Sequence, residues 1–273
     1  MKIAVCMKQT PDSEATIKIN ADGKGIDEQN IKWIMNPYDE YATEVALRLK
    51  EKFAGSETWV VTMGGDRVVE SMRTALAMGI DKGVHLKDPA FVGADAMGEA
   101  KALAAAIKSL GADIILCGKQ AIDWDLSQVP AMMAEILGLP QCTACTFLQI
   151  AADGKSAVVK RKIEGAEETY EISLPAVISI DKGSSVQGSD PIQEARYASL
   201  PGIMKAKKKE IKPVGLADTG LTAADVGASG AKVQVSGYEA LPERAAGKVF
   251  KDQDTAEMVK QVVKLLREEA KVI

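Results

Sequence analysis

Short apolar runs alternate with longer amphipathic segments along the first half of the chain. The runs cover residues 2–7, 58–63, 82–86 and 113–117. Runs this short and this apolar are typical of parallel strands that are buried on both faces. Helix-like segments lie between them, beginning at Asn36, after Gly64 and at Gly93. This alternation predicts an α/β fold with a doubly wound, mostly parallel, Rossmann-like sheet and right-handed crossovers.

The pattern changes after Pro140. Alternating apolar residues predict strands over 143–150, 156–162, 168–172 and 176–180, with turns at Asp153-Gly154 and Glu164-Gly165. We expect these strands to form an antiparallel extension of the main sheet or a small sheet beside it. Residues 181–191 have little apolar content and no regular period, so an irregular segment is expected there.

The C-terminal part of the chain has a different character again. Residues 211–247 lack periodicity and are rich in Gly, Ala, Pro and Asp, which is typical of an extended arm rather than a packed core. Residues 255–271 predict an amphipathic helix with Met258, Val262, Val263 and Leu266 on one face. We therefore expect a nucleotide-binding α/β domain over 1–210, followed by an arm and a helix over 211–273.

The loops after the predicted parallel strands carry the candidate binding residues. The carboxyl ends of such strands meet at one edge of the sheet, where ligands bind. Asn36, Gly64 and Gly118 lie at these ends. Ser127 is the predicted N-cap of a helix that ends near Gly138. The unpaired N–H groups and the dipole of that helix favour an anion, so the loops predict an adenine-nucleotide pocket.

Pro130 modifies this predicted anion site. It falls on the third residue of the expected helix, where its missing N–H breaks no helical hydrogen bond. Gln128, Val129 and Ala131 then remain as backbone donors. The site should still bind an anion, with its remaining donors on either side of the N–H that Pro130 lacks.

Charge narrows the range of partners. The chain has a net charge of −4 and a pI near 5.3, which argues against nucleic-acid binding. The basic cluster of the chain consists of Lys205, Lys207, Lys208, Lys209 and Lys212. This cluster is compatible with an acidic partner, although a solvated face is the usual case for such a cluster. No apolar run approaches a membrane span and the N-terminus lacks a signal-peptide pattern, so a cytoplasmic protein that is not embedded in a membrane is expected.

The sequence shows none of the residue combinations that usually carry out acid–base or nucleophilic catalysis. The single histidine, His85, lies in a predicted strand and has no serine elbow or supported acid pair to accompany it. Cys142 and Cys145 form a lone C-x-x-C motif, whereas a zinc site of this type needs a second pair. We therefore expect neither catalytic residues nor a metal site.

Several motifs resemble the β subunit of electron-transfer flavoproteins. The most specific are Gly118-Lys-Gln-Ala-Ile-Asp123 followed by Gln128, and Arg196-Tyr-Ala-Ser-Leu-Pro-Gly-Ile-Met-Lys-Ala-Lys-Lys-Lys209. Met35-Asn-Pro-Tyr38, Arg73-Thr-Ala-Leu-Ala-Met-Gly79 and Leu174-Pro-Ala-Val177 agree with the same family. The resemblance covers nearly the whole chain in order.

The resemblance implies a heterodimer in which the C-terminal arm wraps an α subunit that holds most of an FAD. This chain would bind AMP in a structural role. In electron-bifurcating members a second FAD occupies the same pocket and oxidises NADH, and both alternatives stay open. Electrons would pass from flavin dehydrogenases, such as an acyl-CoA dehydrogenase, to a downstream acceptor. The chain would then be an electron carrier rather than a catalyst with its own acid–base residues. A stand-alone nucleotide-binding or sensing domain is the alternative of a different class.

The resemblance also implies individual site residues. The cofactor-binding positions are Cys6, Asn36, Pro37, Tyr38, Asp39, Met63, Asp123, Trp124, Asp125, Leu126, Ser127, Gln128, Val129, Pro130, Ala131, Met132, Met133 and Ala134. Tyr38 would approach the flavin of the α subunit, while Ser13 replaces a second aromatic residue there.

The segment before Arg196 resembles the recognition loop by which the family docks a dehydrogenase, near residues 181–200. It is longer than in ordinary members and lacks their leucine anchor. Val186 or Ile192 is the expected substitute, next to Arg196 and Tyr197. The Gln128-Val129 pair is closer to bifurcating members, whereas the motif that begins at Arg196 is closer to ordinary ones.

Overall fold

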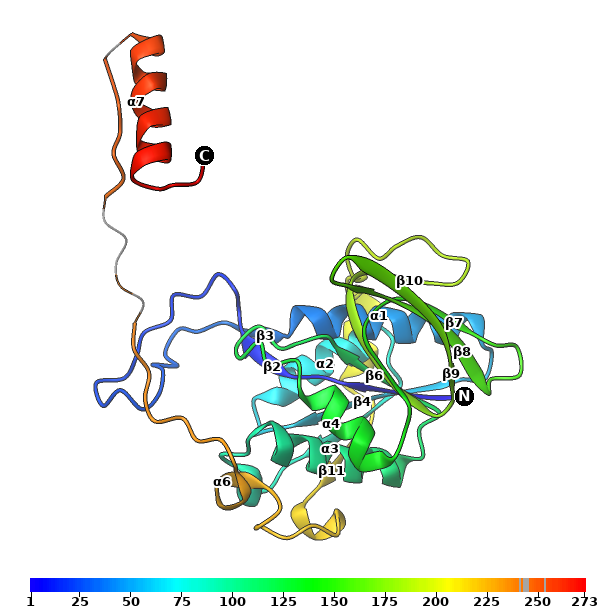
Figure 1. The fold of residues 1–273 in the computed structure, drawn as a ribbon. Helices are drawn as coiled ribbons and strands as arrows, with labels where there is room; N and C mark the ends of the chain where they lie inside the picture. The colour runs from blue at the N-terminus through cyan, green and yellow to red at the C-terminus, as the bar shows by residue number, and fades with distance from the viewer. Residues whose placement is uncertain (241, 243–245, 253) are drawn as a thin grey trace. The chain divides into compact units, whose positions relative to one another are not determined.

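The computed structural model describes residues 1–240, 242, 246–252 and 254–273. The chain divides into two compact units, Met1–Gly237 and Tyr238–Ile273. The first unit contains the sheet and the helices that cover it (Figure 1). The second unit contains the terminal helix α7 (Thr255–Glu268).

The first half of the chain alternates strands and helices as predicted. Its elements are β1 (Lys2–Cys6), β2 (Gln9–Pro11), β3 (Trp33–Met35), α1 (Pro37–Lys52), β4 (Glu57–Met63), α2 (Val68–Met78), β5 (Lys82–Leu86), η1 (Pro89–Phe91), α3 (Ala96–Leu110), β6 (Ile114–Gly118) and α4 (Val129–Leu137). Strands β2 and β3 pair with each other outside the main sheet. The remaining strands of this half are buried and aliphatic, as parallel strands covered on both faces require.

The second half adds further strands and short helices. They are β7 (Gln141–Ile150), β8 (Ser156–Ile163), β9 (Ala166–Ser173), β10 (Ala176–Val186), α5 (Leu200–Ala206), β11 (Ile211–Val214), η2 (Leu216–Asp218) and α6 (Gly227–Gly230). The main sheet has nine strands in the order β11-β5-β4-β1-β6-β10-β7-β8-β9. The predicted doubly wound, mostly parallel sheet with an antiparallel extension is therefore confirmed.

Strand β10 corrects one part of the prediction. It was expected in the antiparallel extension, but it pairs in parallel with β6 on one side and with β7 on the other. Within the main sheet, only the β7–β8 and β8–β9 pairs are antiparallel among the described strands. Strand β10 also continues to Val186, beyond the expected end at residue 180, because Ser185 and Val186 pair with Phe147 and Leu148 of β7.

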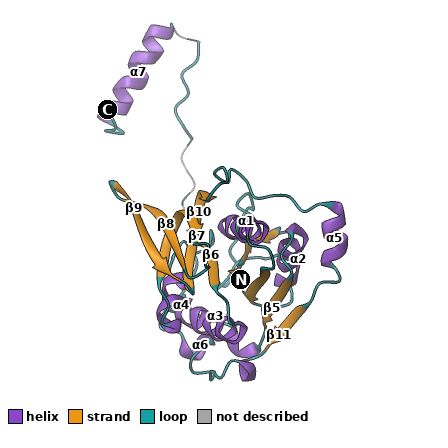
Figure 2. Cartoon of the chain, turned by 90° about the vertical axis from the view of Figure 1, so that its right-hand side faces the viewer, coloured by secondary structure: helices purple, strands orange, loops and turns teal. Residues whose placement is uncertain are grey.

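Two aliphatic cores hold the layers together. One lies between the sheet and helices α1 and α2, where Ala42, Val45 and Leu49 of α1 are fully buried. The other lies on the opposite face, under α3 and α4, and includes Ala102 and Met133. Figure 2 shows the two helix pairs on opposite sides of the strands. The alanines let helices approach the sheet closely, so few aromatic residues are needed to fill the core.

The expected boundary between residues 210 and 211 is wrong. Strand β11 pairs in parallel with β5, and Val214 and Val226 are buried in the second core. The carboxylate of Asp95 accepts a hydrogen bond from the N–H of Lys232 at 2.6 Å and so holds the chain beyond α6. The first unit therefore extends to Gly237. Residues 241, 243–245 and 253 of the predicted arm lie outside the described residues.

Helix α7 confirms the predicted amphipathic helix at the C-terminus. The carboxylate of Asp254 caps its first turn by accepting a hydrogen bond from the N–H of Ala256 at 3.0 Å. Its apolar stripe contains Val262, Val263 and Leu266, and no residue of α7 is buried. None of the helices in the described part of the chain is long and apolar enough to cross a membrane.

Candidate functional site

The carboxyl ends of β1, β4 and β6 meet beside the N-terminus of α1. Cys6 at the end of β1 is in register with Val61 of β4 and with Cys117 of β6. The predicted convergence of the loops that follow these strands is therefore present. In doubly wound sheets this edge is the usual place for a ligand. We call this edge, with the loops that follow β1, β4 and β6 and the start of α3, the crevice.

Asn36 connects two of these loops. It is the N-cap residue of α1, as predicted, but its side chain makes no capping hydrogen bond. Its Nδ2 donates to the carbonyl oxygen of Gln120 at 2.9 Å, and its Oδ1 accepts from the N–H of Ile122 at 3.2 Å. The side chain thereby fixes the loop that follows β6, which we call the β6–α4 loop (residues 119–128).

Asp39 is the buried centre of the site. Its carboxylate accepts hydrogen bonds from the N–H of Lys8 at 2.7 Å and from the N–H of Gly118 at 2.9 Å. Burial raises the pKa of Asp39 to about 7, although hydrogen bonds from Lys8, Asn36 and Gly118 act in the opposite direction. Since each carboxylate oxygen already binds a backbone N–H, Asp39 holds the strand ends together rather than offering itself to a ligand.

Gly118 makes this arrangement possible. A Cβ atom at this position would collide with the carboxylate of Asp39 and lie 2.8 Å from the carbonyl carbon of Tyr38. Glycine is therefore required where β6 passes under the first turn of α1. This observation explains the glycine of the Gly118-Lys-Gln motif in physical terms.

Ion pairs fix both ends of the crevice. Lys8 Nζ lies 2.8 Å from the carboxylate of Asp123, in the β6–α4 loop. Lys119 Nζ lies 3.0 Å from the carboxylate of Asp181, in β10. Lys8 was missed by the sequence analysis, although its position directly after β1 is a signal that could have identified it.

The middle of the β6–α4 loop has an unusual backbone. Asp125 and Ser127 both adopt left-handed conformations, with φ angles of 51° and 54°. Non-glycine residues adopt this conformation at a cost, and such residues gather at functional sites. The side chain of Gln120 supports both of them, because its Nε2 donates to Asp125 and its Oε1 accepts from Ser127 Oγ. Gln120 is a second residue that the sequence analysis did not assign.

The N-terminus of α4 differs from the prediction in one respect. Ser127 has a left-handed backbone and is not the N-cap; the loop continues for one more residue, and Gln128 takes the N-cap position. Pro130 is thereby the second helical residue instead of the third, and it still breaks no helical bond. Within the described part of the chain, the N–H groups of Gln128, Val129 and Ala131 have no acceptor. This donor set fits a phosphate group.

The other predicted cofactor positions fall into two groups. Trp124 and Leu126 are 48% and 50% exposed, so the β6–α4 loop presents apolar side chains to solvent. Met133 and Ala134 are fully buried in the core under α4, which contradicts their assignment as contact residues. Their burial follows from the helical period, which turns this part of α4 towards the sheet.

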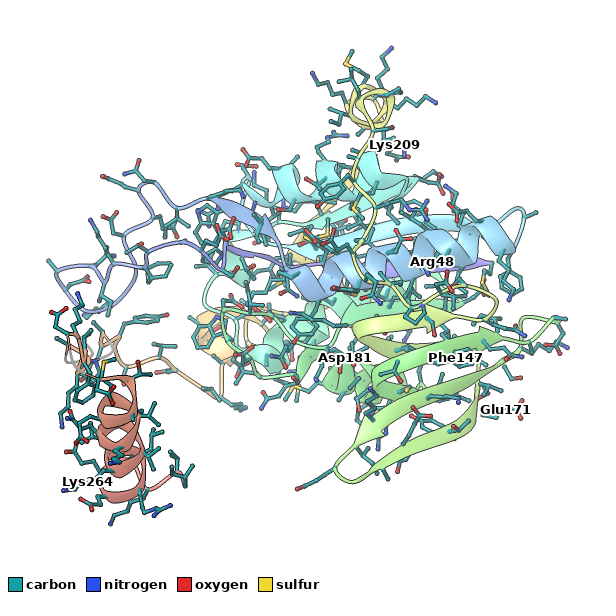
Figure 3. All side chains as sticks on the ribbon, turned by 90° about the horizontal axis from the view of Figure 1, so that it is seen from above. Arg48, Phe147, Glu171, Asp181, Lys209 and Lys264 are labelled. Carbon is teal, nitrogen blue, oxygen red and sulfur yellow. The ribbon has the colours of Figure 1, made fainter. Side chains whose placement is uncertain are left out.

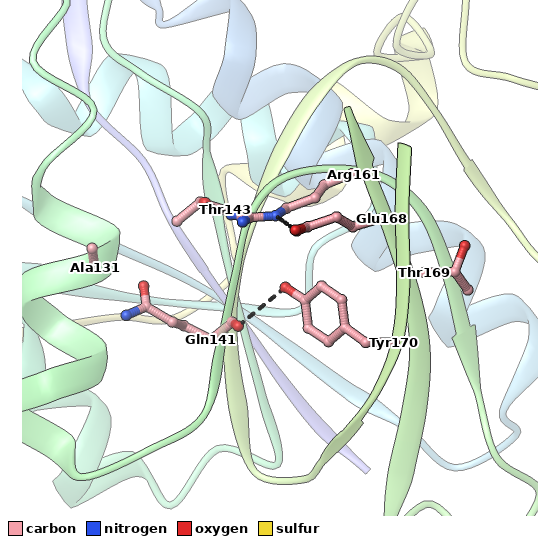
Figure 4. Close-up of a pocket in the computed structure, with 7 residues that line it drawn as sticks. All are labelled: Ala131, Gln141, Thr143, Arg161, Glu168, Thr169 and Tyr170. Atoms are coloured by element: carbon pink, nitrogen blue, oxygen red, sulfur yellow. Dashed lines mark hydrogen bonds and ion pairs between the residues drawn. The ribbon is translucent and has the colours of Figure 1, made fainter. Parts of the chain in front are cut away.

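Two open pockets lie next to these elements. The larger has a volume of about 720 Å³ and is lined by Ala131, Gln141, Thr143, Arg161, Glu168, Thr169 and Tyr170 (Figure 4). Only Ala131 among its lining residues was predicted for the site. Arg161 is already engaged, with Glu168 at 2.6 Å and Thr143 at 2.8 Å. This pocket therefore lies beside α4, on the antiparallel extension, and shares Ala131 with the N-terminal turn of α4.

The second pocket lies where the β10–α5 connection (residues 187–199) meets α1. Pro37, Tyr41, Lys182, Arg196 and Tyr197 are among the residues that line it. Tyr38, expected to face a flavin, is half-buried near this pocket, with Lys182 Nζ 5.2 Å from the centre of its ring. Tyr197 is 88% exposed, and its role in partner recognition stays a prediction.

The predicted anchors of the recognition loop are not at the surface. Val186 and Ile192 are 3% and 0% exposed and belong to the core under α1. The structure therefore contradicts their assignment as docking residues. They are buried because β10 extends to Val186 and because the N–H of Ile192 is bound to the carbonyl oxygen of Ser184 at 2.8 Å.

Arg196 is also engaged within the chain. Its guanidinium lies 2.7 Å from the carboxylate of Glu44 and 2.5 Å from that of Glu51, both on α1. Arg48, which is labelled in Figure 3, reaches the same connection by donating to the carbonyl oxygen of Asp190 at 2.6 Å. Arg196 thus fastens the β10–α5 connection across α1 and is not free for a partner.

The cysteines form two buried sets. Cys6 and Cys117 are neighbours on β1 and β6, and Cys142 and Cys145 lie on β7. Ala144, with a φ angle of 52°, shifts the alternation of β7 so that both cysteines of the C-x-x-C motif face the core. In the described part of the chain, no group of three or more His, Cys, Asp or Glu residues is placed to hold a metal ion.

Comparisons with known proteins agree with this architecture. The model of the electron transfer flavoprotein domain matches residues 24–219. The β subunit of the electron transfer flavoprotein from Syntrophomonas wolfei is 41% identical over 271 residues, covering 97% of this chain and 98% of that protein. The β subunit from Bacillus subtilis is 39% identical over the full length of both chains. The human β subunit is 36% identical, covering 96% of this chain and 98% of its own length.

Proposed function

The chain belongs to the electron transfer flavoprotein family as a β subunit, and from this premise we propose that it binds AMP and helps to position an FAD in a heterodimer. The FAD, when bound, takes up and releases the electrons that the complex carries between dehydrogenases and a downstream acceptor. In our proposal the residues of this chain bind and orient the nucleotide and the FAD.

The observation that carries this proposal is the braced loop in front of a helix N-terminus. Asn36 and Lys8 hold the first half of the β6–α4 loop, and the N–H groups at the start of α4 remain available. In our proposal the AMP phosphate binds these N–H groups, and Trp124 stacks on the adenine ring. An already ordered loop lowers the entropic cost of binding, which suits a structural nucleotide.

The second unit supports the assembly of a heterodimer. Helix α7 has an apolar stripe, and none of its residues is buried. An amphipathic helix is stabilised mainly by packing of its apolar face, so α7 needs a cover. In our proposal the α subunit supplies this cover. Leu266→Asp in the full chain should then lower the yield of co-purified heterodimer. Val272→Asp, at an exposed position after the helix, is the matched control and should leave the yield unchanged.

The test of the proposed function is the nucleotide content of the purified heterodimer. Acid release followed by chromatography should yield one FAD and one AMP per heterodimer. Two FAD per heterodimer with no AMP would replace this proposal with the electron-bifurcating type. A nucleotide-bound chain that never co-purifies with an α subunit would favour a stand-alone binding domain.

A further inference from the structure

Glu99 lies in the crevice at a position that the proposed function does not yet use. It is in the first turn of α3, which begins at the same edge of the sheet as the crevice. Ala102, Leu103 and Ala106 are buried at the positions three, four and seven residues later. Residues at these intervals share one face of a helix. Glu99 therefore continues the buried stripe of α3 by one turn, to the level of the strand ends.

The carboxylate of Glu99 has no hydrogen-bond donor within the described part of the chain, although the residue is half-buried. Burial raises its pKa; Lys8 lowers it, and the nearby carboxylates of Asp123 and Asp95 raise it further. These three residues are the charged groups that act on Glu99 from the elements packed around it.

Lys8, the cation that acts on Glu99 within the described residues, is already neutralised by another acid. Lys8 Nζ lies 2.8 Å from the carboxylate of Asp123. Asp95 caps α3 through the N–H of Gly98 and also binds the N–H of Lys232, which favours its ionised form. The described groups at this end of the crevice are therefore more negative than positive, whereas the N-terminus of α4 offers N–H donors to an anion.

We propose that Glu99 determines the specificity of the crevice: it admits a nucleotide with a single phosphate and excludes nucleotides in which a second phosphate follows the first. This inference rests on the proposed function, since it takes the crevice as the nucleotide site. One phosphate binds the N–H groups of α4. Lys8 and Lys119 are already paired with Asp123 and Asp181, so a second phosphate meets no unpaired cation of the crevice among the described residues, and it adds negative charge beside the carboxylates of Glu99 and Asp123. Repulsion between like charges is strong where water is partly excluded.

The experiment compares AMP and ADP as probes on the purified heterodimer. The wild-type complex is exchanged against an equimolar mixture of the two nucleotides, passed through gel filtration and analysed for retained nucleotide after acid release. We expect the wild type to retain AMP over ADP by about tenfold or more, as a single like charge at short range predicts. Glu99→Gln should reduce this preference about tenfold. Glu99→Asp, which keeps the charge, should retain most of it.

Glu135→Gln is the matched control, because it removes the same charge from an exposed residue of α4 and should leave the AMP preference unchanged. Lys8→Gln tests the proposal in the opposite direction. It removes the cation beside Asp123, so it should increase the preference for AMP. Together the two crevice variants keep the test decisive if one of them folds poorly.

The outcomes separate this inference from the proposed function. If the wild type retains AMP and Glu99→Gln shows the same ratio of AMP to ADP, the inference is overturned and the proposed function stands. If the wild-type complex retains neither nucleotide, the proposed function fails and the inference fails with it. If the AMP preference falls in Glu99→Gln, stays in Glu99→Asp and rises in Lys8→Gln, both the inference and the proposed function are supported.

Discussion

The connections that leave β6 and β10 start from neighbouring strands of the sheet, yet they treat their apolar residues in opposite ways. The β6–α4 loop exposes Trp124 and Leu126. The β10–α5 connection buries Ile192 completely and follows a strand whose last residue, Val186, is buried too. An apolar residue in a loop is therefore no guide to a binding surface until its surroundings are known.

The two connections are also held by different forces. Polar contacts brace the β6–α4 loop, through Asn36 at one point and the Lys8–Asp123 ion pair at another. Hydrophobic burial of Ile192 and the contacts of Arg196 with Glu44 and Glu51 hold the β10–α5 connection. In our proposal the first connection binds a ligand, whereas the second is part of the core. Substitutions in the two should therefore affect different measurements.

The largest expected effect is on the β10–α5 connection. Ile192→Ala should lower the free energy of unfolding by about 2–5 kcal/mol, because a fully buried side chain leaves a cavity. Tyr197→Ala, five residues later and 88% exposed, should change it by less than about 0.5 kcal/mol. Chemical denaturation of both variants measures the difference. Equal stabilities would show that the burial of Ile192 contributes nothing, and the contrast between the connections would disappear.

A somewhat smaller effect is expected where β6 enters its loop. Gly118→Ala should lower the free energy of unfolding by up to about 3 kcal/mol, because the added Cβ meets Asp39 and the backbone of Tyr38. It should also reduce nucleotide retention, because a shift of Asp39 would displace Asn36 at the start of the same helix. Gly65→Ala is the control, because nothing lies within 4 Å of a Cβ there. A Gly118→Ala variant that is as stable as the wild type would contradict the close approach of β6 to the first turn of α1.

The ion pairs of Arg196 give the third effect, with a defined pH dependence. Burial alone would raise the pKa of Glu44, but Arg196 and Arg48 donate hydrogen bonds to its carboxylate and the net pKa is lowered. A lowered carboxyl pKa stabilises the fold above the ordinary value of 4.5, and this contribution disappears as the pH falls through the folded pKa. Glu44→Gln should therefore cost about 1.5 kcal/mol at pH 7 and less in acid.

Denaturation at a series of pH values from neutral to acid tests this expectation. The curves of wild type and Glu44→Gln should converge at low pH. Glu51→Gln, which removes the exposed partner of Arg196, should cost less than about 1 kcal/mol. A Glu44→Gln deficit that is constant across the pH range would mean that the charge of Glu44 is not what holds the connection.

The smallest effect on stability is expected at Trp124. Trp124→Ala removes a half-exposed side chain and should change the free energy of unfolding by less than about 0.5 kcal/mol. AMP affinity of the heterodimer should nevertheless fall by about 1–3 kcal/mol, the usual contribution of an aromatic ring stacked on a base. Trp124→Phe should recover most of the affinity. Calorimetric titration with AMP measures both, and an unchanged affinity in Trp124→Ala would remove Trp124 from the site.

The sequence was sufficient for the alternation of parallel strands and helices from β1 to α4 and for the loops that form the crevice. Hydrophobic periodicity identifies each strand and helix from its own residues. The ends of these elements then identify Asn36, Gly118 and the residues before α4. Local pattern failed where contacts are distant in the chain. Lys8 and Gln120 are short-range neighbours of strand ends, but their partners, Asp123 and Asn36, come from other loops. The sequence contains no local signal for such pairs.

The amino-acid sequence by itself determined the fold class, the family and the amphipathic character of α7, because each depends on residue order alone. Only the tertiary structure decided that β10 is a parallel strand, that Ile192 is buried and that Arg196 is bound to Glu44, 152 residues away. Burial and ion pairing depend on which distant segments share a face of the sheet. The periodicity of one segment carries no information about the segment that will cover it.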